Sequence, residues 1–295
     1  MIGLYSANSQ SGVGFTGLLD DYPDAAAAYS VRRLSSTYSG ALIEVRRSSD
    51  NTVQDIGYDS DGDLDTAALL SFVGAGDGFV RTWYDQSGNN KNLTQTTTSN
   101  QPILVNSGTL EQQNTLPAVR FVSNDYLESS LTSQFNFLHD GTESLISSVF
   151  NTSLTSGIMG SAGGSGSDIG YSQRVRASTS FQSLIANGTS FIVNNIIGAV
   201  TANQLIIFQD EIDANNATVS DRSKIYLDDS AAYQSNSSTG TASSSDASYT
   251  FKIGAWGNLS LYMSGYFSEA VFWDSDQSSN REDIRDNQNT YYSIY

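Results

Sequence analysis

The sequence of 295 residues contains no cysteine, which excludes disulfide bonds, thiolate catalysis and cysteine-ligated zinc. A single histidine, His139, excludes a histidine-rich metal site and leaves a Ser-His-Asp triad only one possible base. Basic residues are also few, since 14 Lys and Arg stand against 31 Asp and Glu and give a net charge of −17. Because phosphate contact needs a basic surface, nucleic acid is not an expected partner.

Long apolar runs are absent as well. No segment approaches the roughly 18 consecutive apolar residues of a membrane-spanning helix, so we expect no membrane insertion. The first ten residues, MIGLYSANSQ, lack the basic and apolar regions of a signal peptide. We therefore expect a chain that is made in a cytoplasm and not exported, either as a cytosolic protein or as part of a particle assembled there.

The hydrophobic and aromatic content and the pattern of apolar runs predict a folded β protein. Hydrophobic residues make up 38% and aromatic residues 11% of the chain, which argues against disorder. From about residue 101 onward, short apolar runs alternate with loops rich in Gly, Ser and Asn, a pattern typical of an antiparallel sandwich or barrel. These runs cover residues 102–105, 118–122, 144–150, 190–200, 204–210, 224–229, 249–256 and 266–273.

The first third and the last residues carry helix signals. Start signals and alanine content predict a helix over 24–34, and Asp65 is the expected N-cap of a helix over 65–73. Between and after them, 41–47 and 78–84 are expected strands, and 278–292 is an expected C-terminal helix. We expect an extended N-terminal arm over 1–17 and one β-sandwich domain over 18–295.

Two segments resemble a known family. Residues 34–57 read LSSTYSGALIEVRRSSDNTVQDIG and residues 83–95 read WYDQSGNNKNLTQ. Together they resemble the N-terminal half of the α-L-arabinofuranosidase B catalytic domain, which is a β-sandwich of the concanavalin A-like (laminin-G-like) superfamily. The resemblance implies an all-β fold, a concanavalin A-like jelly-roll sandwich with short flanking helices.

These two segments, which we call the cassette, are also similar to segments of phage structural proteins. The C-terminal residues 275–295 resemble the same proteins, because SDQSSNR is followed there by an expected helix and the ending YYSIY. The arabinofuranosidase family carries a vicinal cysteine pair near its sugar pocket, and its catalytic acids are carboxylates in the second half of the domain. This chain has no cysteine, and we find no Asp-x-Glu nucleophile motif over 140–295. These differences favour a phage-type member without catalytic acids.

Two motifs of the cassette supply candidate ligand-binding residues. The arginines of VRRSSDN can form bidentate hydrogen bonds with a carboxylate, either within the turn or on a ligand. The aromatic, acidic and amide side chains of YDQSGNNKN can stack on and hydrogen-bond a sugar, or they can form an Asx-turn around Gly88. The candidates are Arg46, Arg47, Asp50, Asp55, Tyr84, Asp85, Gln86 and Asn89.

Four alternating aspartates in YDSDGDLD are candidate calcium ligands. Asp59, Asp61, Asp63 and Asp65 could surround Ca²⁺ with oxygens. The segment departs from the EF-hand pattern, because its glycine comes at the fourth position and its twelfth position is Leu70. A solvated acidic turn whose last aspartate caps the next helix is the alternative, so calcium is a possible cofactor only.

A third acidic motif, QDEID over 209–213, resembles the start of the acid motif of β-sandwich glucanases. Alternation along a strand would place Glu211 and Asp213 on one face. The third acid expected at 216 is replaced by Asn216, which favours an acidic turn at the end of a strand. If the chain were nevertheless a glycoside hydrolase, two of five acids would face a pocket: Asp210, Glu211, Asp213, Glu143 or Glu269.

These observations favour a non-enzymatic virion protein, a capsid-decorating, spike or tail-associated module with lectin-like potential. Its expected partners are other virion proteins through the N-terminal arm and host surface glycans, and we expect a homo-oligomer because multivalency strengthens weak lectin sites. The expected location is the virion. A glycoside hydrolase of α-L-arabinofuranosidase type and a purely structural cement protein are the alternatives.

Overall fold

The computed structural model describes residues 14–153, 155–176, 180–198 and 201–295. Most of the expected arm over 1–17 lies outside these residues, so the arm and the domain boundary after it remain predictions. Within the described residues, three α-helices and three short 3-10 helices accompany twenty strands. The helices are α1 (Leu18–Asp21), α2 (Thr66–Val73), α3 (Arg281–Tyr292), η1 (Thr98–Asn100), η2 (Thr132–Leu138) and η3 (Val219–Arg222).

The strands are short in the first half of the chain and longer in the second. The first eleven are β1 (Ala27–Ser30), β2 (Ile43–Arg47), β3 (Val53–Ile56), β4 (Gly78–Trp83), β5 (Leu93–Thr94), β6 (Ile103–Asn106), β7 (Thr109–Leu110), β8 (Gln112–Gln113), β9 (Leu116–Pro117), β10 (Val119–Phe121) and β11 (Leu127–Glu128). The others are β12 (Ser144–Thr152), β13 (Ser156–Gly160), β14 (Ile169–Arg176), β15 (Ser180–Asn187), β16 (Phe191–Ile197), β17 (Ile206–Ile212), β18 (Ser223–Leu227), β19 (Lys252–Ile253) and β20 (Gly265–Trp273).

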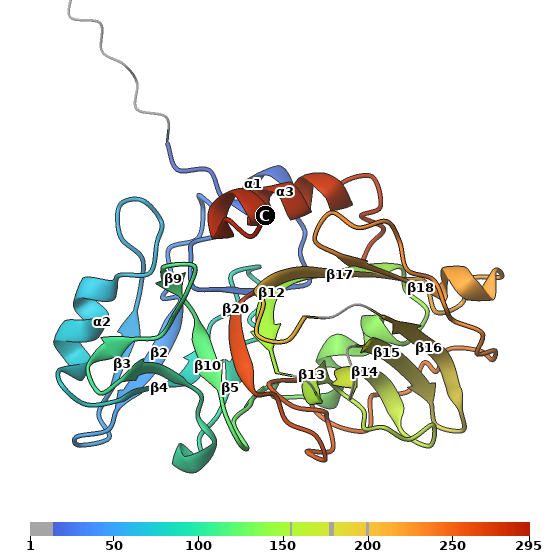
Figure 1. The fold of residues 1–295 in the computed structure, drawn as a ribbon, viewed down its shortest axis with the longest axis horizontal. Coiled ribbons are helices and arrows are strands. Elements are labelled where there is room, and N and C mark those ends of the chain that lie inside the picture. Colours follow the sequence, from blue (N-terminus) through green and yellow to red (C-terminus); the bar gives the residue numbers. More distant parts are fainter. Residues whose placement is uncertain (1–13, 154, 177–179, 199–200) are drawn as a thin grey trace, which may run out of the picture.

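The strands pair antiparallel throughout and form two layers. One layer centres on β20, which pairs with β1 and β10 on one side and with β12 on the other, and continues through β17 to β18. The second layer runs from β3 through β2, β4, β5, β11, β19, β13, β14 and β15 to β16. Since β6 pairs with both β4 and β10, the layers are joined along one side. The expected all-β sandwich is confirmed (Figure 1).

Aromatic side chains fill the space between the layers. Phe181 of β15 lies 5.8 Å from Phe150 of β12 and 5.4 Å from Phe208 of β17, measured between ring centroids. Trp83 of β4 similarly meets Phe267 of β20 edge to face at 6.4 Å. Because these pairs connect strands of opposite layers, one apolar core holds the sandwich together.

The C-terminal helix covers the outer face of the β20 layer. Figure 1 shows α3 lying with α1 across β12 and β17. Ile284 packs with Leu145, Val271 and Trp273 in a small apolar cluster, and Gln288 accepts a 2.7 Å hydrogen bond from Ser147 of β12. The expected helix over 278–292 is therefore confirmed, although it begins at Arg281. No helix among the described residues has the length and apolar character needed to cross a membrane.

The first expected helix, over 24–34, is wrong. Residues Ala27–Ser30 form β1, whose four side chains are all buried. Helix propensity is high for alanine, but β1 pairs in register with residues 269–272 of β20. It buries Ala27 and Tyr29 in the main core and Ala28 in a cluster with the leucines of α1. A tertiary pairing partner some 240 positions later thus overrides the local preference. The second helix is confirmed, because Asp65 accepts a 2.9 Å hydrogen bond from the Ala68 amide and caps α2.

Candidate functional site

The cassette that carries the family resemblance has structural roles. The Asp85 carboxylate accepts hydrogen bonds from the Ala28 amide at 2.9 Å and from the Lys91 amide at 3.0 Å. The Gln86 side chain accepts from the Leu34 amide at 2.8 Å and donates to the Arg32 carbonyl at 2.9 Å. The loop after β4 therefore fixes β1 and the segment that follows it.

The remaining candidates from the cassette also have partners within the protein. Asn89 donates to the Ala25 carbonyl at 3.0 Å, and Tyr84 donates to Asp55 at 2.7 Å. On the surface, the Arg47 guanidinium donates two hydrogen bonds to the Asp50 carboxylate, at 2.9 Å and 2.6 Å.

Arg46 is buried. Its guanidinium donates to the Gln101 side chain at 2.6 Å and to Asn51 at 2.8 Å, and it lies over the ring of Phe79. All eight candidates are thus held by protein partners, which favours the structural alternative. Whether any of them also contacts a ligand remains a prediction.

The four aspartates proposed as calcium ligands do not converge on one point, and they have different structural roles. Asp59 accepts from the amides of Asp61 and Asp63 and closes a turn. Asp63 accepts a hydrogen bond from Tyr291 of α3, and Asp65 caps α2. In the described part of the chain, no group of three or more Asp, Glu or His side chains is arranged to hold a metal ion. The geometry therefore supports the acidic turn and gives no support to a calcium site.

The five acids considered for hydrolysis separate into two groups. Asp210 and Glu269 are fully buried. Asp210 accepts hydrogen bonds from Ser223 at 2.7 Å and Tyr171 at 3.2 Å, and Glu269 is enclosed by Arg32, Ser30, Tyr292 and Gln288. No sugar can reach either carboxyl group, so both are wrong as catalytic candidates.

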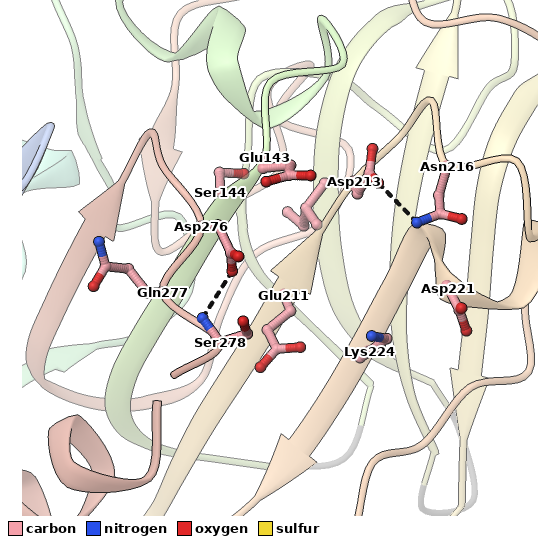
Figure 2. Close-up of a pocket in the computed structure, with 11 residues that line it drawn as sticks. Glu143, Ser144, Glu211, Asp213, Asn216, Asp221, Lys224, Asp276, Gln277 and Ser278 are labelled. Carbon is pink, nitrogen blue, oxygen red and sulfur yellow. Dashed lines mark hydrogen bonds between the residues drawn. The ribbon is translucent and has the colours of Figure 1, made fainter. Parts of the chain in front are cut away.

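The other three acids line one open cleft of about 150 Å³ at the end of β17 (Figure 2). Glu211 is the last but one residue of β17, Asp213 follows the strand, and Glu143 precedes β12. Because Asp213 lies beyond the end of β17, the structure agrees with the acidic turn at the end of a strand that the sequence favours. Asp213 accepts a 2.8 Å hydrogen bond from Asn216 in a tight turn. The lining residues are Glu143, Ser144, Glu211, Ile212, Asp213, Asn216, Asp221, Lys224, Asp276, Gln277 and Ser278.

Glu211 is the acid of the cleft whose pKa is raised. Its side chain is 15% exposed and accepts from Tyr226 at 3.2 Å, and the Arg281 Nε lies 3.4 Å from Oε1. The Arg281 guanidinium in turn stacks on the Tyr226 ring at 3.8 Å. Burial raises the pKa of Glu211, and the hydrogen bond from Tyr226 and the charges of Lys224 and Arg281 only partly oppose this effect.

Asp276 lies in the loop between β20 and α3, and its pKa is shifted in the opposite direction to that of Glu211. The Ser278 amide donates to its carboxylate at 2.9 Å, and hydrogen bonds from Ser278 lower the pKa of Asp276. The charge of Asp276 is in turn among the influences that raise the pKa of Glu211. The cleft therefore holds one carboxyl group whose pKa is raised and one whose pKa is lowered.

Sequence reasoning missed the three other charged lining residues, Asp221, Lys224 and Asp276. Asp276 lies in the SDQSSNR segment, which was noted for its resemblance and not for its chemistry. Its approach to Glu211 depends on how the β20–α3 loop folds back over β17, and no spacing in the sequence reveals that arrangement.

Comparison with known proteins gives two related results. Residues 20–120 match the family model described as "Alpha-L-arabinofuranosidase B, catalytic". No curated protein gives a significant match to the chain.

Solved structures of GH54 α-L-arabinofuranosidases share the fold. One, soaked with a cyclic sulfate inhibitor, aligns with a TM-score of 0.70 and 16% identity. An arabinofuranosidase complexed with arabinofuranosyl-α-1,2-xylobiose aligns at 0.62, and a Glu-to-Gln mutant soaked with 4-nitrophenyl α-L-arabinofuranoside aligns at 0.60, both with 17% identity. In each case the alignment covers 95% of this chain and 66% of the other, so the chain spans slightly less than two thirds of those proteins.

These comparisons define the class of the fold, a concanavalin A-like β-sandwich of the arabinofuranosidase type. They also correct the main functional interpretation of the sequence. The expected non-enzymatic virion protein, with its phage, decoration and host-attachment roles, is contradicted by the family-model match and by the arabinofuranosidase structures. The glycoside hydrolase alternative agrees with these findings.

Proposed function

We propose that the chain is a glycoside hydrolase of α-L-arabinofuranosidase type that cleaves its substrate in the acidic cleft at the end of β17. The observation that carries the proposal is the pairing of Glu211 and Asp276 in one open cleft, with their pKa values displaced in opposite directions. Glycosidases need two such carboxyl groups, one that donates a proton and one that stays ionised.

In this mechanism Glu211 is the general acid. Its carboxyl group protonates the glycosidic oxygen as the bond to the sugar breaks, and Tyr226 and Arg281 fix the orientation of the carboxyl group. Asp276, held ionised by Ser278, faces the positive charge that develops at the anomeric carbon from the opposite side of the sugar ring. After the first product leaves, a water molecule adds to the anomeric carbon and gives its proton to the Glu211 carboxylate, which restores the acid. Neither step requires a metal ion or a cofactor.

The experiment that tests this proposal measures release of 4-nitrophenol from 4-nitrophenyl α-L-arabinofuranoside by the full chain and its variants. Glu211→Gln and Asp276→Asn each remove one carboxyl group with little change in shape, and each is expected to lower kcat at least about 100-fold. Asp61→Asn, an exposed acid in the turn before α2, is the matched control and should retain full activity.

Thermal unfolding of each variant checks that the fold is intact. The proposal is overturned if the folded wild-type chain releases no nitrophenol from this or related furanosides. It is also overturned if activity is present and survives both Glu211→Gln and Asp276→Asn.

A further inference from the structure

The single histidine of the chain has no part in the proposed hydrolysis, yet it is completely buried. His139 follows η2, and its Nε2 lies 3.0 Å from the carbonyl oxygen of Ser245, which comes 106 positions later in the chain. Because a carbonyl oxygen can only accept a hydrogen bond, Nε2 carries the proton of the neutral imidazole. The other ring nitrogen, Nδ1, has no hydrogen-bond partner among the described residues.

Ser245 belongs to a surface segment, residues 237–247, which we call the strap. All residues of the strap are described; they form no helix or strand, and only Ala247 among them is buried. Both ends of the strap are fixed, because Asn236 accepts a 2.8 Å hydrogen bond from an amide of β16 and the Ser248 amide donates one of 2.8 Å to a carbonyl of β14. A segment of this kind can open locally while the sandwich stays folded.

Two side chains hold the C-terminal end of the strap. Asn136 of η2 donates to the Asp246 carboxylate at 2.9 Å and accepts from the Ala247 amide at 3.2 Å. His139 supplies the neighbouring hydrogen bond, to the Ser245 carbonyl. Of these two side chains, the imidazole is the one whose charge ordinarily changes between about pH 5 and pH 8.

The surroundings of His139 favour the neutral imidazole. Protonation adds an N–H at Nδ1, which has no acceptor among the described residues, and it adds a buried charge. Burial therefore lowers the pKa of His139, and the Ser245 carbonyl and the charges of Asp140 and Asp246 only partly oppose this effect. Asp140 lies beside the histidine in the chain and Asp246 lies on the strap. The described residues of β14 also pack against η2, but none of their charges acts appreciably on the imidazole.

We propose that His139 is a pH-sensitive latch, which holds the strap closed while the imidazole is neutral and releases it when the imidazole takes up a proton. In the open form the imidazole is hydrated, and its pKa returns to about 6.5. Above that pH both forms are neutral, and the closed strap keeps its full stability. Below it the open form binds a proton that the closed form does not. The ratio of closed to open strap then falls by up to about tenfold per pH unit, until the closed form is protonated as well.

The experiment measures hydrogen exchange of the full chain by mass spectrometry at about pH 8 and about pH 5, on either side of the ordinary histidine pKa. After correction for the intrinsic exchange rates, protection of the strap should fall at least about tenfold at the lower pH, whereas peptides from β12 and β20 should keep theirs. The imidazole NMR signals come from His139 alone and report its protonation directly. We expect the neutral form with the proton on Nε2 at the higher pH, and a titration that coincides with the opening of the strap.

Two variants assign the effect to the latch. His139→Gln retains an N–H for the Ser245 carbonyl but cannot take up a proton, so its strap should be equally protected at both pH values. Asp210 and Asp125, whose pKa values burial raises to about 7 and about 6, still titrate in this variant and so serve as an internal control. Asn136→Ala removes two hydrogen bonds of the strap and keeps the histidine. It should lower protection at both pH values and retain the pH dependence of the wild type.

The latch is independent of the proposed hydrolysis, because neither the exchange nor the NMR measurement uses a substrate. Equal protection of the wild-type strap at the two pH values overturns the proposal, and so does a His139→Gln variant that keeps the pH dependence of the wild type. If His139→Gln does not fold, the wild-type chain decides alone, since a protonated imidazole beneath a strap that is still protected overturns the latch.

Discussion

Arg32 and Glu269 form a buried, two-pronged ion pair between residues 237 positions apart. The Arg32 Nε donates to Glu269 Oε2 at 2.8 Å and its Nη2 donates to Oε1 at 3.1 Å. Ser30 and Gln288 supply further hydrogen bonds to the same carboxylate. Burial by itself would raise the pKa of Glu269, but the facing guanidinium and these hydrogen bonds lower it below its usual value. The pair joins the first strand, the last strand and α3.

The first prediction concerns this pair. Glu269→Ala should lower the free energy of unfolding by about 3–5 kcal/mol, because it leaves the Arg32 charge buried without its partner. Chemical denaturation monitored by circular dichroism measures the change. Asp50→Asn, which breaks the exposed Arg47–Asp50 pair, is the control and should leave the unfolding midpoint nearly unchanged. A Glu269→Ala variant as stable as wild type would show that the pair is not structurally important.

The second prediction concerns Asp210 in the core. Burial raises the pKa of Asp210 to about 7, against about 3.9 in an unfolded chain. Between these values the folded protein retains a proton that the unfolded chain has released. The contribution of this carboxyl group to stability is therefore complete below about pH 4 and is lost as the pH rises towards 7.

Asp210→Asn removes this titration while keeping the size of the side chain. At pH 8 the variant should be more stable than the wild type by about 1–4 kcal/mol, and at pH 4 the two should be similar. Urea denaturation across this pH range measures both. If the difference in unfolding free energy between the wild type and Asp210→Asn is the same at pH 4 and pH 8, the raised pKa of Asp210 is contradicted.

The third prediction concerns Gly254, which follows β19. Its φ is +93°, and a Cβ atom there would lie 2.4 Å from a ring carbon of Phe121 and 2.9 Å from the Asp125 carbonyl oxygen. Gly254→Ala should therefore lower the unfolding free energy by more than about 1 kcal/mol, through both backbone strain and the clash. Gly57→Ala is the matched control, because nothing lies within 4 Å of its Cβ position and its φ is not positive. Thermal unfolding of both variants provides the comparison.

The fourth prediction concerns the pH dependence of the proposed hydrolysis. Because burial raises the pKa of Glu211, the general acid should remain protonated above the pH at which an ordinary glutamate ionises, and kcat should fall as the pH rises through that pKa. Tyr226→Phe removes a hydrogen bond that favours the ionised form, so it should shift this limb of the profile to higher pH. A shift to lower pH, or none, would exclude Glu211 as the acid.

The sequence predicts the β-sandwich well, because strand alternation and turn residues act locally. The N-cap at Asp65 and the acidic turn at Asp213 were predictable for the same reason. The strand nature of residues 27–30 was not, since it depends on pairing with β20. The role of Asp276 was not predictable either, because it depends on the fold of one loop over another strand. The absence of a linear acid motif argues against hydrolysis in the sequence, whereas the acids of the cleft come from separate segments.

The pairing of β1 with β20 also has a consequence for how the protein is made. Residues 27–30 emerge from the ribosome long before residues 269–272, so their backbone amides and carbonyls have no partner strand until residues 269–272 have been made. Until then the nascent chain exposes unpaired strand edges that can join those of another chain. We expect a slow, late folding step and a requirement for chaperone protection during translation, which the lag between synthesis and protease resistance would reveal.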